Sequence, residues 1–155
     1  MIKIDRGKNL KLMADSEINI YDNIHHLYLF LPNGVCIFHY AFKINPEIEP
    51  QLVSGGFTGI FSLIQLFTHS QSRIKIVEQE EMTIFFEHGE IVSAALISEK
   101  NLDLYRNQLK KLIQAVEDDF REELEFFKGN ITEFQKIEGY VEQFFEIKDN
   151  IKYNR

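Results

Sequence analysis

The sequence lacks the features that mark several large classes of protein. Its 155 residues include a single cysteine and no tryptophan, so no internal disulfide forms and a reducing compartment is expected. No block of basic residues provides an electrostatic footprint for nucleic acid, and the formal net charge is −7. No apolar run is long enough for a transmembrane helix, and no signal-peptide core follows the first methionine. We therefore expect a cytoplasmic protein that binds no nucleic acid and has no transmembrane segment.

Catalytic signatures are also missing. The sequence contains no Gly-x-Ser-x-Gly, no His-Glu-x-x-His and no paired-carboxylate pattern. Ser54-Gly55-Gly56 with Gly59 suggests a phosphate loop, but no Lys-Ser/Thr follows it and no strand leads directly into it. The acidic cluster between residues 117 and 125 is interpreted as a solvated face or a dock for a basic partner. These absences predict a protein that is not an enzyme and needs no cofactor.

Histidine and cysteine side chains are candidates for a metal site and a reactive thiol. His25, His26 and His39 come close together on the hairpin described below, but a metal site needs a third ligand from elsewhere. Strand histidines usually form hydrogen bonds instead, so we expect no metal site. Cys36 is expected to be a buried and inert thiol on the same sheet face as Leu29.

The regular alternation of apolar segments is the most informative feature that is present. It predicts the order β-β-α-β-β-β-α-α over residues 25–147. Residues 1–24 are expected to be an N-terminal extension, either a short strand or mobile, and residues 148–155 a polar tail. At this length the chain is one domain with a substantial core.

The first two strands form a predicted hairpin. Residues 27–31 and 35–42 are apolar and flank Asn33-Gly34, which favours a type I′ turn because both of its central positions need positive φ. Phe30 would then pair with Ile37. Both faces of the hairpin are apolar, so helices are expected on both sides of the sheet, and the second strand is expected at a sheet edge.

The next apolar segment predicts one long helix. Asn45-Pro46-Glu47 is typical of a helix start, and the pattern continues to His69. The apolar arc expected to face the sheet consists of Leu52, Val53, Gly56, Phe57, Ile60, Leu63, Ile64 and Phe67. The remaining arc carries no formal charge, which is typical of a protein interface but also of a small polar face covered by residues 1–24. The predicted interface residues are Gln51, Ser54, Gly55, Thr58, Phe61, Ser62, Gln65 and Leu66.

The rest of the chain predicts a three-strand meander and two helices. The expected strands are residues 73–78, 82–87 and 91–98, with turns at 79–81 and at His88-Gly89. One helix is expected to run from Asp103 until Gly129 ends it, with Glu117 on its outer face. Thr132 and Gln135 form a capping box for the last helix.

This order resembles the longin domain over about residues 25–147. The segments that carry the resemblance are Pro32-Asn33-Gly34, Leu52-Val53-Ser54-Gly55-Gly56-Phe57, Gly89-Glu90-Ile91-Val92 with Ala94-Ala95-Leu96, and Phe127-Lys128-Gly129-Asn130 with Phe134. The last of these is also similar to roadblock-like proteins. Roadblock domains have a helix before the first hairpin, whereas residues 1–24 have no helical period, which favours longin.

The resemblance implies an α+β fold: a five-stranded antiparallel sheet with one helix on one face and two on the other. It also implies a non-enzymatic domain that dimerises, with an identical chain or another longin or roadblock chain, and binds a small GTPase. Such proteins act as activators, exchange factors, or adaptors in trafficking and polarity. Because no heptad segment follows the domain, no SNARE role is expected. The alternative is a small-molecule sensor with a ligand between sheet and helix.

Overall fold

The computed structural model describes residues 20–43 and 48–146 and contains one five-stranded antiparallel sheet. The strands lie in the order β2-β1-β5-β4-β3. The elements are η1 (Ile20–Asn23), β1 (Ile24–Phe30), β2 (Cys36–Ala41), α2 (Pro50–Thr68), β3 (Ile76–Glu78), β4 (Thr83–His88), β5 (Ser93–Ser98), α3 (Asp103–Asp119), α4 (Arg121–Glu125), η2 (Thr132–Lys136) and α5 (Ile137–Phe144). The predicted fold class and element order are confirmed.

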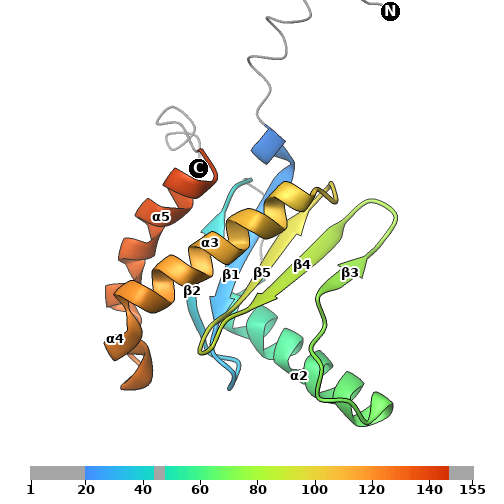
Figure 1. Ribbon diagram of the computed structural model, residues 1–155, viewed down its shortest axis with the longest axis horizontal. Helices are drawn as coiled ribbons and strands as arrows, with labels where there is room; N and C mark the ends of the chain where they lie inside the picture. The colour runs from blue at the N-terminus through green and yellow to red at the C-terminus, as the bar shows by residue number, and fades with distance from the viewer. Residues whose placement is uncertain (1–19, 44–47, 147–155) are drawn as a thin grey trace, which may run out of the picture.

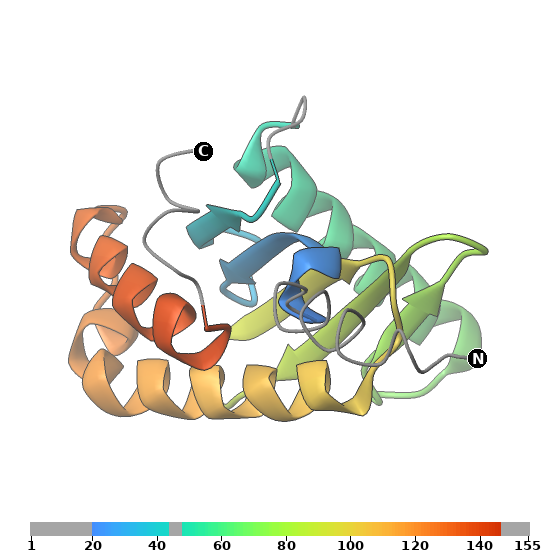
Figure 2. The ribbon, with the colours of Figure 1, turned by 90° about the horizontal axis from the view of Figure 1, so that it is seen from above.

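Helices cover both faces of the sheet, as the two-sided apolar hairpin predicted. In Figure 1, α3 crosses in front of the sheet with α5 beside it, and α2 lies behind; Figure 2 shows these layers from above. The main core lies between the sheet and α3 with α5, and it buries Leu27, Leu29, Leu96, Leu109 and Val141. Ala94 and Ala95 are fully buried, and these small side chains allow helices to approach β5 on both faces.

The core on the α2 side is much smaller. Its buried residues are Tyr28, Phe30, Cys36, Phe86 and Ala95. Val53, Phe57 and Phe61 of α2 pack against this cluster while remaining partly exposed. The α2 face of the sheet is therefore covered by one helix that is itself poorly buried.

The hairpin loop differs from the predicted type I′ turn. The N–H of Gly34 donates to the carbonyl of Leu31 (2.8 Å), and the N–H of Leu31 donates to the carbonyl of Val35 (2.9 Å). Gly34 has φ +90°, whereas Asn33 is not among the described residues with positive φ. This pattern is a three-residue loop in which Pro32 begins the turn and Gly34 supplies the left-handed position.

The longer loop introduces a β-bulge into the hairpin. His26 pairs with Ala41 and Leu29 with Phe38, but Phe30 pairs with Cys36, so the predicted Phe30–Ile37 pair is wrong. Because the bulge inserts one residue, Cys36 and Ile37 lie on the opposite sheet faces from those predicted. Cys36 joins the α2-side core, and Ile37 joins the main core. Cys36 is buried as predicted, and burial raises the pKa of its thiol to about 11.

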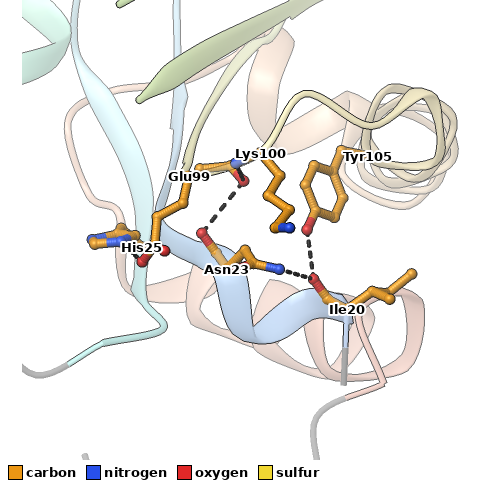
Figure 3. A network of polar contacts seen from close by, with 7 residues as sticks. Ile20, Asn23, His25, Glu99, Lys100 and Tyr105 are labelled. Carbon is orange, nitrogen blue, oxygen red and sulfur yellow. Dashed lines mark hydrogen bonds and ion pairs between the residues drawn. The ribbon is translucent and has the colours of Figure 1, made fainter. Parts of the chain in front are cut away.

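At the end of the predicted N-terminal extension, the described chain enters the sheet through the 3-10 helix η1. The Tyr105 hydroxyl of α3 and the Asn23 side chain both donate to the carbonyl of Ile20, at 2.5 Å and 3.2 Å. The N–H of Glu99 donates to the carbonyl of Asn23 (2.9 Å), and the Glu99 carboxylate lies 2.7 Å from His25 (Figure 3). These contacts join η1 to α3 and to the end of β5. The remaining predictions for residues 1–19 and for the polar tail from 148 lie outside the described residues.

Several boundaries of helices, strands and turns differ from the predicted ones. α2 begins at Pro50 with Glu49 as its N-cap, so the helix start expected at residues 45–47 is wrong; positions 44–47 lie outside the described residues. The N–H of Gly89 donates to the carbonyl of Val92 (2.8 Å), which places the β4–β5 turn at Glu90 and Ile91 instead of His88-Gly89. β3 and β5 are also shorter than expected.

The C-terminal helices are broken where one continuous helix was expected. α3 ends at Asp119, and Phe120 (φ −118°) separates it from the five-residue α4. The break turns Phe120 into the core against Phe134, with ring centroids 5.7 Å apart. Gly129 has the expected positive φ of +104° but lies beyond the end of α4. The last helix opens with η2, where the N–H of Thr132 bonds to Asn130 Oδ1 (3.0 Å) in place of the predicted capping box.

Candidate protein-interaction surface

The orientation of α2 differs in part from the predicted one: Val53 and Phe57 pack against the sheet as expected, but the large side chains of the predicted apolar arc from Ile60 to Phe67 are exposed. The structure describes all nineteen residues of α2, and among them Ser54 alone is buried. The Ser54 hydroxyl donates to the carbonyl of Gly34 in the hairpin loop (2.6 Å). Phe57 and Phe61 contact Phe86 edge-on, with ring centroids 5.1 Å and 4.9 Å apart. The side of α2 that carries Ser54 and the two phenylalanines therefore faces the sheet.

Gln51 attaches the start of α2 to the edge strand. Its side-chain Nε2 donates to the carbonyl of Cys36, and its Oε1 accepts from the N–H of Cys36, both at 2.8 Å. The carboxamide thereby occupies the outward backbone groups of that residue, as a neighbouring strand would. β2 is an edge strand, as predicted. At Cys36, however, this edge is already occupied within the chain.

The predicted interface is not a continuous exposed surface. Ser54 is buried, Thr58, Phe61 and Gln65 are half-buried against the sheet side, and Gln51 is bonded to β2. Gly55, Ser62 and Leu66 are the predicted positions that are exposed without such a contact. Part of the predicted interface therefore lies against the sheet, because Gln51 and Ser54 hydrogen-bond to backbone groups of the hairpin and Phe61 packs on Phe86.

The other side of α2 forms a wide apolar surface, called here the exposed α2 arc. It consists of Leu52, Gly56, Gly59, Ile60, Leu63, Ile64, Leu66 and Phe67. Leu52, Leu66 and Phe67 are 68–70% exposed, and Ile60 and Leu63 about half exposed. An apolar helix face of this length is normally buried. Contiguous apolar surface of this kind on a folded domain marks an interaction site.

Three helical glycines have no explanation within the described chain. A Cβ built on Gly55, Gly56 or Gly59 meets nothing within 4 Å. Each glycine costs about 1 kcal/mol of helix stability relative to alanine, so a close contact normally accounts for it. No described residue makes that contact at Gly56 or Gly59, so these two glycines leave the exposed α2 arc open to a close approach by another helix.

The arc also carries no charge, although the chain as a whole is acidic. No Asp, Glu, Lys or Arg occurs between Pro50 and Thr68. By length and composition α2 is apolar enough to cross a membrane. Its packing against Phe30 and Phe86 ties it instead to the sheet of a folded domain. An uncharged apolar centre is what the core of a protein–protein interface has.

The second exposed feature is the far edge of the sheet. β3 is an edge strand whose three residues are all exposed, including Ile76 and Val77. Arg106 of α3 holds this strand in place: its guanidinium donates to the carbonyls of Lys75 (2.8 Å) and Phe86 (3.0 Å) and pairs with Glu87 (3.0 Å). β3 is thus held in place and pairs with β4 on one side, while no described strand pairs with its outer side.

The histidines considered as metal ligands do not form a metal site in the described part of the chain. His26 Nδ1 and His39 Nε2 lie 3.1 Å apart, which confirms their predicted juxtaposition, and both rings stack near Tyr28. His25 bonds to Glu99 instead (2.7 Å). No group of three potential ligands occurs among the described residues.

Glu117 was expected on the solvated face of α3, and that expectation is wrong. The residue is 4% exposed, and its carboxylate accepts from the backbone N–H groups of Glu90 (3.2 Å), Ile91 (2.6 Å) and Val92 (2.9 Å). Gly89 lies so close that an added Cβ would clash with the Glu117 carboxylate and with Ile113 Cγ2. The side chain fixes the β4–β5 turn to α3.

His88 at the end of β4 is held from both sides. Its Nε2 lies 2.9 Å from the carbonyl of Ile74, so this nitrogen carries the proton, and its Nδ1 lies 2.9 Å from Ser93 Oγ. Burial lowers the pKa of the imidazole below its ordinary value. The folded protein therefore favours the neutral ring.

This depressed pKa predicts an acid-linked loss of stability. The unfolded chain takes up a proton near the ordinary pKa of about 6.5, before the folded chain does, so protonation favours unfolding. The His88 contribution is present above that pH and is lost progressively as the pH falls towards the folded pKa. Urea unfolding between about pH 7.5 and 5.5 should show a steeper decline for the wild type than for His88→Gln. Parallel declines in the two proteins would contradict the buried neutral imidazole.

Comparison with known proteins identifies the architecture. The sequence matches no protein-family model and no curated protein sequence. Among solved structures, MglB of Myxococcus xanthus aligns with a TM-score of 0.53 at 15% identity, covering 78% of this chain and 96% of that one. The roadblock/LC7 domain from Streptomyces avermitilis gives 0.49 at 15% identity (64% and 87% covered), and the gliding protein MglB from Thermus thermophilus gives 0.43 at 13% (64% and 78%).

The alignment to the Myxococcus protein extends over nearly all of that protein and most of the described residues here. At this level of identity the alignment shows a likeness in fold: the chain shares its fold with MglB of Myxococcus xanthus.

Proposed function

We propose that this chain is a non-enzymatic interaction protein that pairs with a second copy of itself through the exposed α2 arc and, as a dimer, binds and regulates a small GTPase. The observation that carries the proposal is the arc itself: apolar, uncharged, and aligned on a nineteen-residue helix that buries one residue. Fully burying a leucine or phenylalanine is worth about 1.5–3 kcal/mol, so the arc leaves several kcal/mol unrealised in the single chain.

A second copy fits this surface for electrostatic reasons. Each chain has a formal net charge of −7, so most pairs of surfaces from two copies repel each other. The exposed α2 arc has no formal charge and can face its own copy without that penalty. A two-fold arrangement of this kind is self-complementary, because each arc meets the same arc.

Gly56 and Gly59 allow the two helices to approach closely at their crossing. Helices normally pack about 8–10 Å apart, and small residues at the contact reduce that separation. The exposed β3 strand lies at an edge of the sheet and offers further backbone groups to the assembly. Pairing with a different chain of the same fold uses the same surface and is the heteromeric form of the proposal.

The GTPase part of the proposal rests on the resemblance to longin and roadblock proteins and on the likeness in fold to MglB. Regulation would proceed by holding the nucleotide-dependent switch segments of the partner or by lending a surface to it. No catalytic group of this chain is assigned to that step.

The test is direct binding. Purified small GTPases encoded in the same genome, each loaded with GDP or a non-hydrolysable GTP analogue, are passed over the immobilised protein by biolayer interferometry. The proposal expects at least one GTPase to bind saturably, with a clear preference for one nucleotide state. Absence of binding across the whole set in both states would contradict the GTPase assignment and leave the dimer to be tested separately.

A further inference from the structure

A cleft lies beside α2, away from the exposed α2 arc. It has a volume of about 210 Å³ and is bounded by α2, the hairpin loop and the β4–β5 turn. Phe30, Phe61 and Ile91 form its apolar wall, and Ser62, Gln65 and Arg73 its polar side. Pockets between a sheet and a helix with an apolar wall and few polar groups are the usual form of small-molecule sites.

The cleft is kept open by contacts on either side of it. Near the hairpin, Ser54 fixes α2 to Gly34. Near the end of α2, Gln65 Nε2 donates to the carbonyl of Gln71 (3.2 Å), which ties the helix to the following loop. Phe61 stacks on Phe30 with centroids 6.2 Å apart and so presents an aromatic wall.

The polar groups that line the cleft differ in whether they already have a partner within the protein. Both ring nitrogens of His88 are engaged, by Ile74 and Ser93. Glu90 also lines the cleft; its largely exposed carboxylate is paired with Arg121, at 3.1 Å. The guanidinium of Arg73 has no ion pair with any described residue, and it is the positive group that lines the cleft. An arginine fork matches a carboxylate with two parallel hydrogen bonds.

Size and chemistry together define the ligand. A protein cavity of about 150 Å³ holds benzene, so about 210 Å³ has room for one ring with one small substituent. The aromatic wall favours a planar ring, and Arg73 favours an anionic substituent. We propose that this cleft binds a small aromatic or similarly flat molecule that carries one carboxylate, with the ring against Phe30 and Phe61 and the carboxylate on Arg73.

This site is independent of the proposed dimer. Ser62 and Gln65 lie on the flank of α2 next to the sheet, whereas Leu63 and Phe67 belong to the exposed α2 arc. A ligand in the cleft therefore contacts the helix without occupying the surface expected to bind the second copy. Loss of ligand binding need not abolish dimerisation, and loss of dimerisation need not abolish ligand binding.

The test uses benzoate as the probe and benzamide as its uncharged counterpart. Backbone amide shifts of the ¹⁵N-labelled full chain are followed by NMR during titration. We expect saturable shifts for Ser62, Gln65 and the β4–β5 turn, with a benzoate Kd on the order of 1 mM, as ligand efficiency allows for a molecule of this size. Benzamide should bind about tenfold more weakly, which is the expected effect of one charge-assisted hydrogen-bonded pair.

Arg73→Gln removes the charge and keeps a polar side chain on the surface. It should weaken benzoate about tenfold and leave benzamide unchanged, while the matched control Lys136→Gln, on exposed η2, leaves both unchanged. Absence of saturable shifts at these residues would overturn the site. Equal binding of benzoate and benzamide, or benzoate binding that persists in Arg73→Gln, would overturn the assignment of Arg73 as the anion-binding group.

Discussion

Ile60→Glu combined with Leu63→Glu is expected to convert the proposed dimer into a folded monomer. Both side chains lie at the middle of the exposed α2 arc and are about half exposed. In a two-fold assembly the two substitutions place four carboxylates in one desolvated contact, where like charges and unpaired ions are strongly unfavourable. Interface centres commonly lose about 2 kcal/mol or more per substitution, so the dissociation constant should rise by roughly a thousandfold or more.

Sedimentation velocity at several concentrations measures this change. The matched control is Leu104→Glu, which also replaces an exposed leucine by glutamate but on α3, away from α2. The control should sediment as the wild type does. The urea midpoint of the double variant should remain close to that of the wild type, because exposed positions rarely shift stability by more than about 0.5 kcal/mol. A double variant that still sediments as a dimer would place the interface elsewhere.

Glu117→Gln is expected to cause the largest loss of stability of any single carboxylate change in the described chain. The wild-type carboxylate accepts from three backbone N–H groups of the β4–β5 turn while almost fully buried. A glutamine offers one acceptor oxygen and turns an NH₂ group towards donors, so at least one buried N–H loses its partner. Hydrogen bonds to charged groups are worth about 1.5–3 kcal/mol each, and we expect a loss of about 3–5 kcal/mol.

The free energy of unfolding in urea gives this value, with Glu122→Gln on the exposed surface of α4 as the control. Gly89→Ala should also destabilise, because its new methyl group meets the same carboxylate and Ile113. Since the two substitutions disturb one contact, their combined effect should be smaller than the sum of the separate effects. A wild-type-like midpoint for Glu117→Gln would mean that the turn does not depend on this contact.

The sequence was sufficient for the order of the elements, because turn residues and periodicity are local signals. Asn33-Gly34 located the hairpin, and the apolar runs located five strands and the long helices. The hairpin register failed at one place: the sequence does not distinguish a two-residue loop from a three-residue loop that begins at Pro32. That single residue inserts the bulge and moves Cys36 to the other face.

The orientation of α2 could not be read from its pattern. The prediction assumed that the wider apolar arc faces the protein's own core, which holds for a helix whose partners all lie in the same chain. Here the arc from Leu52 to Phe67 is exposed, and Ser54, with the hydroxyl bond to Gly34, faces the sheet. The available signal was the absence of charge on every side of the helix, which is typical of a helix with contacts on more than one side.

The prediction that Glu117 lies on a solvated face was wrong for a related reason. Its residue type indicates a solvated position, and nothing local reveals three backbone donors that lie more than twenty positions earlier in the chain. The cleft beside Arg73 is likewise assembled from α2, the hairpin loop and the β4–β5 turn. Sequence patterns could not predict contacts between segments that lie far apart in the chain.

The most direct test of the central claim is an isotope-filtered NMR experiment on a mixed sample, in which ¹³C-labelled and unlabelled copies of the wild-type chain are combined. Only contacts between two copies give intermolecular NOEs in this sample. The account predicts NOEs from Ile60, Leu63 and Phe67 of one copy to the α2 residues of the other. Absence of intermolecular NOEs at millimolar concentration, or NOEs confined to surfaces other than α2, would contradict it.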